Sequence, residues 1–233
     1  MKKHVTLDEV KYNLGEEFCT AMMRLGANGK EARKCFNRLA KCYGEKHRKY
    51  HTLLHLAHCL EGFGKVAMYA HNRYAIVLAI FYHDVVYNPL RRDNEAESAK
   101  YFKFDMWNVL EIRDKMLVDK VARMIMQTKH HQLDSTDDRD CALFLDVDMS
   151  ILGAEPHVYD QYSSDLVRRE YDHYSDEEWA VARIEFFLDP TIDSATAGVP
   201  IFHTRVMREK YEERAIANLK EERVRLQKFL PVA

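Results

Sequence analysis

The most apolar stretch of the chain is AIVLAIFYHD at residues 75–84, where eight apolar or aromatic residues run directly into His83 and Asp84. A run without a polar face predicts a helix that is buried on all sides, and we expect it to extend from about residue 72 to residue 87, with Pro89 ending it. The apolar part is far too short to cross a bilayer. The stretch therefore predicts the central helix of a folded core.

The sequence on both sides of this stretch repeats its apolar residues at the helical period. Thr6 and Glu9 form a capping box for one helix, Asn28 caps a second, and Asn94 with Glu97 predicts a cap for another. A polar run predicts a loop at residues 134–138, and residues 189–200 are the longest loop candidate. Further helices are expected at about residues 50 to 62–64, 94–104, 110–130, 155–174, 176–188 and 203–229, and one more follows the first loop and carries Phe144, Leu145, Ile151 and Leu152.

Composition supports an all-helical fold and excludes several other classes. The 233 residues include only 8 Gly and 5 Pro, too few turn formers for an all-β sandwich or barrel. A net charge of −2 argues against binding nucleic acid through a strong basic field. Five cysteines without a C-x-x-C pair are typical of reduced thiols. We expect a single all-α domain over residues 1–233, soluble and cytoplasmic, without a leader peptide or membrane segment.

Histidines cluster just before the central helix. His51, His55 and His58 lie at positions i, i+4 and i+7, which places them within about 60° of one another on a helix. A bound cation would explain why three imidazoles share a face. An exposed polar face is the simpler interpretation of the same spacing.

Two further motifs place carboxylates inside apolar sequence. A buried Asp84 is costly unless it is paired, hydrogen-bonded or bound to a metal, and a hydrogen-bonded pair with His83 is the alternative to a metal. Asp146 and Asp148 also lie within apolar sequence, and on a helix their side chains point about 160° apart. We take Asp148 as the ligand and Asp146 as a supporting or helix-packing residue, although the assignment could be reversed.

Taken in order, these motifs resemble the HD superfamily of metal-dependent phosphohydrolases, in particular its branch of predicted metal-dependent HD phosphohydrolases. The resemblance covers about residues 5–230, with the core motifs at about 48–153 and C-terminal helices at about 155–230. The motifs are Arg48-x-Tyr50-His51-Thr52-x-x-His55, Phe81-Tyr82-His83-Asp84-x-Val86-Tyr87, Asn94-Glu95-x-x-Ser98-Ala99, Thr128-x-x-His131 and Leu145-Asp146-x-Asp148-x-Ser150-Ile151-Leu152-Gly153.

The resemblance implies an HD-type helical bundle with one divalent metal ion. Its ligands would be His51, His83, Asp84 and Asp148, a set that suits Mn²⁺, Fe²⁺, Co²⁺, Ni²⁺, Zn²⁺ or Mg²⁺. Asp84 would also orient the attacking water. His55 would support the ligands or contact the substrate.

Charged residues near these motifs are further candidates. Glu95 is a candidate general acid or base, unless it only complements a helix dipole. Arg48, Arg91 and Arg92 are placed to bind a phosphate, although surface arginines are common. His131 is a candidate ligand for a second metal or a helix-terminal residue.

We therefore expect a hydrolase that acts on a small phosphorylated substrate, a phosphomonoester such as a nucleotide. Two alternatives remain open at this stage. A di-iron oxygenase would need additional histidine ligands, and a non-catalytic binding or signalling module would keep the metal only as a structural element. The oligomeric state cannot be read from the sequence.

Overall fold

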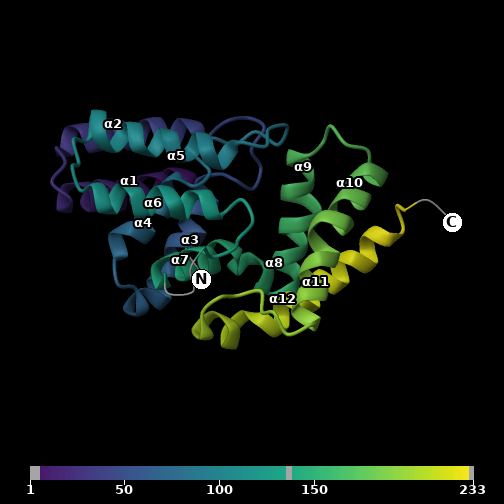
Figure 1. Ribbon diagram of the computed structural model, residues 1–233. Coiled ribbons are helices and arrows are strands. Elements are labelled where there is room, and N and C mark those ends of the chain that lie inside the picture. The colour runs from purple at the N-terminus through teal and green to yellow at the C-terminus, as the bar shows by residue number, and fades with distance from the viewer. Residues whose placement is uncertain (1–5, 135–137, 231–233) are drawn as a thin grey trace. The chain divides into compact units, whose positions relative to one another are not determined.

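A computed structural model describes residues 6–134 and 138–230, and the described residues form helices and connecting turns without a β-strand (Figure 1). The all-α prediction is confirmed. The chain divides into two compact units, one ending at Leu145 and the other beginning at Asp146. The single domain over residues 1–233 stays a prediction. Residues 135–137, most of the predicted loop at 134–138, lie outside the described residues.

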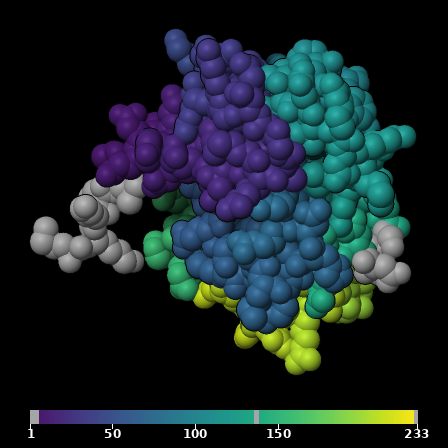
Figure 2. Space-filling view, turned by 90° about the vertical axis from the view of Figure 1, so that its left-hand side faces the viewer, coloured from purple at the N-terminus to yellow at the C-terminus, as the bar shows by residue number. Residues whose placement is uncertain are grey.

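The first unit consists of seven helices and two short helical turns. Their bounds are α1 (Leu7–Arg24), α2 (Gly29–Cys42), α3 (Leu53–Val66), η1 (Ala67–Tyr69), α4 (Arg73–Tyr82), α5 (Asn94–Phe104), η2 (Asp105–Val109), α6 (Lys115–Gln127) and α7 (Arg139–Asp148), which runs on past the boundary. The sequence predicts that α6 begins at about residue 110, five residues before its observed start at Lys115. In Figure 2 the purple, blue and teal surfaces of this unit adjoin one another, in agreement with the packing of α1 on α3 and of α4 on α6.

The first two helices begin at the predicted caps. The Glu9 amide donates to the Thr6 hydroxyl at 3.2 Å, and the Glu9 carboxylate accepts from the Thr6 amide at 2.8 Å. The Asn28 side chain accepts from the amide of Lys30 at 2.9 Å. Each cap satisfies amides that a helix start leaves without a partner.

Helix α4 is the centre of the unit, as the sequence predicts. Every residue from Ala75 to Tyr82 is buried, and α4 packs on α1, α3, α5 and α6. Phe81 meets Phe18 edge-to-face, with 5.1 Å between the ring centroids. Burying an aromatic side chain of this size contributes about 1.5–3 kcal/mol.

Both α3 and α4 are shorter than predicted. Helix α3 starts at Leu53, because the Thr52 side chain caps it, so His51 lies in the turn before the helix. Helix α4 ends at Tyr82, so His83 and Asp84 occupy the following turn instead of a helix. The prediction of three histidines on one helix face is therefore wrong.

The predicted cap of α5 by Asn94 and Glu97 is also wrong. Helix α5 starts at Asn94, and the preceding Asp93 makes no capping bond through its side chain. The Asn94 side chain instead binds the backbone of Asn88 twice, at 3.0 and 2.9 Å, and closes the loop between α4 and α5. Glu97 pairs with Lys100.

The second unit contains five further helices, joined in part by π-helical turns. Their bounds are η3 (Met149–Gly153), α8 (Pro156–Asp160), η4 (Gln161–Val167), α9 (Arg168–Glu170), α10 (Asp176–Arg183), η5 (Ile184–Leu188), α11 (Asp189–Thr196) and α12 (Arg205–Gln227). The loop predicted at 189–200 is mostly helix α11. Pro190 lies in the first turn of α11, where its fixed φ suits a helix, and α11 follows η5 without a break.

Helix α12 packs tightly on the turn η3. A side chain at Gly153 would place its Cβ 2.5 Å from the Cβ of Tyr211, so only glycine fits there. Asn218 donates to the carbonyls of Leu152 and Ala154 at 2.7 and 2.9 Å. Within the described part of the chain, no helix is long and apolar enough to span a membrane.

A buried carboxylate joins three elements of the first unit. Asp105, only 1% exposed, accepts hydrogen bonds from Arg38 at 2.6 Å, from the Cys35 thiol at 2.9 Å and from the Tyr82 hydroxyl at 3.1 Å. Burial, followed by the nearby Asp105 charge, raises the pKa of Cys35, so the thiol stays protonated and can donate.

We expect Asp105→Ala to lower the free energy of unfolding by about 3 kcal/mol, because it leaves buried donors without an acceptor. Urea unfolding measures this. The control Asp93→Ala removes an exposed carboxylate that pairs with Arg91, and we expect it to cost under about 1 kcal/mol. Equal losses in the two variants would contradict the structural role of Asp105.

Asp140 fixes the start of α4 in a similar way. Its buried carboxylate accepts from the amides of His71 at 2.7 Å and Asn72 at 3.1 Å, and from Lys120 Nζ at 2.6 Å. Burial alone would raise the pKa of Asp140, but these hydrogen bonds, with that of Lys120 the strongest, outweigh it and hold the pKa below its usual value.

A lowered pKa in the folded state makes the stabilisation by Asp140 pH-dependent. The contribution is complete above the unfolded pKa, about 3.9, and is lost as the pH falls through the lower folded value. We expect Asp140→Asn to cost about 2 kcal/mol at pH 7 and progressively less below about pH 4. Urea unfolding at several pH values, with Asp119→Asn as control, measures this; a cost independent of pH would contradict it.

Candidate metal centre

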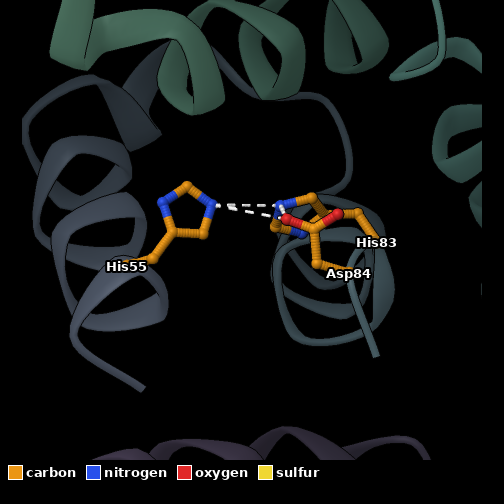
Figure 3. A group of neighbouring side chains, drawn as sticks. All are labelled: His55, His83 and Asp84. Atoms are coloured by element: carbon orange, nitrogen blue, oxygen red, sulfur yellow. Dashed lines mark hydrogen bonds and ion pairs between the residues drawn. The ribbon is translucent and has the colours of Figure 1, made fainter. Parts of the chain in front are cut away.

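Three side chains from two segments converge in the first unit. His55 comes from the first turn of α3, and His83 and Asp84 come from the turn that follows α4 (Figure 3). His83 Nε2 lies 3.1 Å from His55 Nε2 and 3.0 Å from Asp84 Oδ2. His55 Nε2 lies 4.0 Å from the same carboxylate oxygen. One atom from each residue therefore faces a common point.

The other nitrogen of each imidazole is held by a neighbour. His83 Nδ1 lies 3.0 Å from the carbonyl oxygen of Ile80, which can only accept, so Nδ1 carries the proton. His55 Nδ1 lies 3.2 Å from the Tyr50 hydroxyl, which can either accept or donate. Neutral His83 therefore presents the lone pair of its Nε2 to the centre, and His55 does the same in the tautomer whose Nδ1 donates to Tyr50.

Two imidazole lone pairs and a carboxylate oxygen repel one another when they lie this close, unless a cation or a proton lies between them. Such a set of nitrogen and oxygen donors suits a borderline divalent metal. Imidazoles oriented through Nδ1 are typical of metal-binding histidines. The residues present therefore fit a divalent metal ion.

Burial differs across the cluster. The side chains of His55 and His83 are 2% and 1% exposed, and that of Asp84 is 18% exposed. The cluster is therefore closed on the side of the histidines and reachable by solvent on the side of the carboxylate.

His51 lies at this accessible side. Its Nε2 is 3.9 Å from Asp84 Oδ2, its side chain is 20% exposed, and its ring stacks on Tyr87 with 4.1 Å between centroids. The sequence took His51 as a ligand and His55 as a supporting residue. In the structure the ligand atoms of His55, His83 and Asp84 lie close to one another, and His51 lies at the edge of this group. His58, the third histidine of the motif, is exposed.

Comparison of the chain with protein-family models, curated proteins and solved structures finds no match. The candidate site therefore rests on its own geometry.

Arg48 holds the two segments of the cluster together. Its buried guanidinium donates to the carbonyls of Asp84 at 2.6 Å and Val85 at 3.0 Å, and to that of His51 at 3.3 Å. Its Nε donates to Glu45 at 2.9 Å. These bonds engage most of the N–H groups of the guanidinium within the protein, so Arg48 is placed to position the cluster, and phosphate binding by Arg48 stays a prediction.

The remaining candidates of the first unit lie on helix ends and loops. Arg91 is exposed and pairs with Asp93 at 2.7 Å, and Arg92 is exposed beside Lys129, whose Nζ donates to the Arg92 carbonyl at 3.3 Å. Glu95 lies half-buried in the first turn of α5. His131 follows α6 with a positive φ of 48°.

Asp146 and Asp148 belong to the second unit. Asp146 is buried and accepts from the amides of His203 at 2.6 Å and Thr204 at 2.7 Å, and from the Thr204 hydroxyl at 2.5 Å. Burial raises the pKa of Asp146 despite these bonds. Asp146 thus anchors the start of α12. Asp148 is half-buried at the end of α7, and its role as a ligand stays a prediction.

Sequence reasoning missed two groups near His55. The thiol of Cys59 lies 3.7 Å from His55 Nε2, and Tyr50 contacts His55 Nδ1. Cys59 follows His55 by four residues, so helical spacing could have identified it. Tyr50 lies outside the helix, and no periodic signal marks it.

We expect Arg48→Lys to weaken Mn²⁺ binding by about 10–100-fold, because an ammonium cannot donate to three carbonyls in the same fixed geometry. Calorimetric titration of metal-free protein measures the affinity, and circular dichroism checks that the fold persists. The control Arg33→Lys changes an exposed arginine that pairs with Glu16, and it should leave the affinity unchanged. Unchanged Mn²⁺ affinity in folded Arg48→Lys would contradict the positioning role.

Proposed function

We propose that this chain is a metal-dependent hydrolase of phosphate monoesters, of the HD superfamily type. The observation that carries the proposal is the convergence of His55 Nε2, His83 Nε2 and Asp84 Oδ2, with the outer nitrogen of His83 fixed by the Ile80 carbonyl. The ordered motifs of the sequence support the same assignment.

His55, His83 and Asp84 would hold the metal ion. A bound divalent ion supplies a Lewis acid for the phosphoryl oxygen and lowers the pKa of a bound water. The buried imidazoles keep their lone pairs directed at the centre, since Ile80 and Tyr50 hold their Nδ1 atoms. Asp84 is the most exposed of the three, so its carboxylate is also placed to orient water.

His51 is placed to act on the substrate. Its Nε2 can hold a proton near the leaving oxygen, because the ring lies beside Asp84 and is partly exposed. Stacking on Tyr87 keeps the ring in this orientation. In this proposal His51 and His55 exchange the roles that the sequence suggested, and Asp148 remains the further ligand implied by the family resemblance.

The substrate proposal is a small phosphomonoester such as a nucleotide. Arg92 and Lys129 offer two neighbouring positive charges at exposed positions of the first unit. A di-iron oxygenase would need more histidine ligands. The sequence offers His55, His58, His130 and His131 for that role; His58 and His130 are exposed, whereas His55 belongs to the cluster.

We expect His55→Ala to lower phosphate release from p-nitrophenyl phosphate and nucleoside monophosphates by at least about 100-fold with Mn²⁺, Co²⁺ or Ni²⁺ present, because it removes a ligand. His58→Ala is the matched control, since His58 lies on the same helix and is exposed. It should retain most of the activity.

Metal content of the same preparations separates the ligand role from catalysis. His55→Ala should lose bound metal, and His51→Ala should keep the metal but lose activity. The proposal would be wrong if the wild-type protein released no phosphate with any of these metals, or if the His55→Ala and His58→Ala variants were equally active.

A further inference from the structure

The second unit contains a cavity of about 200 Å³ between η4, α10 and the C-terminal end of α12. This volume is below the range of about 300–1,000 Å³ that is usual for drug-sized ligands, so a ligand here would be small. Its wall includes Ser163, Trp179, Arg225, Leu226, Lys228 and Phe229.

Ser163 is the first sign that the cavity binds something. Its side chain is buried, with 2% of the residue exposed, and its hydroxyl has no hydrogen-bond partner among the described residues. A buried hydroxyl left without a partner costs about 1–3 kcal/mol. The residue lies in a π-helical turn, a feature that is frequent at functional sites.

The acidic groups of the cavity wall are already engaged. Glu222 accepts from the Tyr159 hydroxyl and from Arg183 Nε, the latter at 3.0 Å. Asp176 pairs with Arg168 at 2.9 Å. These carboxylates are therefore neutralised by contacts within the protein.

The basic groups at the end of α12 keep donors to spare. Arg225 touches a single carboxylate oxygen, Asp160 Oδ1, at 2.7 Å, whereas a guanidinium has five N–H donors. Lys228 is exposed, and its ammonium lies 4.8 Å from the ring centroid of Phe229. The Lys228 ammonium, the remaining N–H donors of the paired Arg225 and a buried hydroxyl thus border one cavity, and this combination favours an anion.

The rest of the wall is apolar. Trp179 is 6% exposed, and Leu226 and Phe229 complete the surface around it. A purely inorganic anion would leave this apolar surface without contacts. An aromatic or alkyl group would cover it.

We propose that this cavity binds a small organic carboxylate with an aromatic or alkyl body. The carboxylate accepts from Ser163, Arg225 and Lys228, and the body packs on Trp179. The proposal does not depend on the proposed hydrolase function.

The test is a titration with 3-phenylpropionate, followed by tryptophan fluorescence. The chain has two tryptophans, and Trp107→Phe leaves Trp179 as the only reporter. We expect a saturable fluorescence change with 3-phenylpropionate. Binding should be weaker by about tenfold or more for 3-phenylpropan-1-ol, which lacks the carboxylate, and for acetate, which lacks the aromatic body. No saturable change, or equal affinity for the alcohol, would overturn the proposal.

Variants of the wall provide the second arm. Ser163→Ala and Lys228→Gln should each weaken 3-phenylpropionate binding by about tenfold, whereas Lys220→Gln, an exposed lysine on the same helix, should not. Ser163→Ala should also leave the Tm of the ligand-free protein unchanged or higher, because the hydroxyl has no partner to lose. Unchanged binding in Ser163→Ala and Lys228→Gln, or a lower Tm in Ser163→Ala, would overturn the proposal.

Discussion

The last carbonyl groups of a buried helix need hydrogen-bond donors. In this protein Arg48 supplies them in the turn that follows α4. Its guanidinium donates to the carbonyls of Asp84 and Val85 and also reaches the carbonyl of His51. One side chain thereby ends the most apolar helix and ties it to the segment that precedes α3. The spacing of the candidate metal ligands depends on this contact, because it joins the two segments that supply them.

The same arrangement explains why the cluster is chemically unusual. Helix α4 is buried on all sides, so the polar residues that follow it, His83 and Asp84, begin inside the protein. His55 meets them from α3 at hydrogen-bonding distance. Their outward nitrogens are held by Ile80 and Tyr50, and the remaining donor atoms face one another. A divalent cation between these donor atoms would offset their mutual repulsion.

Much of the fold follows from local sequence signals. The cap at Thr6 and the buried stretch from Ala75 to Tyr82 need only local hydrogen bonds and hydrophobicity to be recognised, and both predictions are confirmed. The burial of His83 also follows from the apolar stretch beside it, whereas Asp84, expected to be buried, is 18% exposed because the helix ends at Tyr82.

The errors arise where distant residues decide the structure. The exit from α4 depends on Arg48, which is more than thirty residues away. Helical spacing alone takes no account of that contact. It predicts that α4 continues through Asp84 and that α3 begins at Tyr50, and it therefore places His51 in a helix. The segment 189–200 was the longest loop candidate, but helix continues from η5 into it as far as Thr196. The organic-anion cavity has no sequence signal, because its residues come from three separated segments.

The central claim is that His55, His83 and Asp84 bind one divalent cation. Anomalous X-ray diffraction from crystals grown with Mn²⁺ tests it most directly. The account predicts a single strong anomalous peak within about 2.0–2.4 Å of His55 Nε2, His83 Nε2 and a carboxylate oxygen of Asp84. A well-ordered cluster without a peak at saturating Mn²⁺, or a peak bound only by other residues, would contradict it.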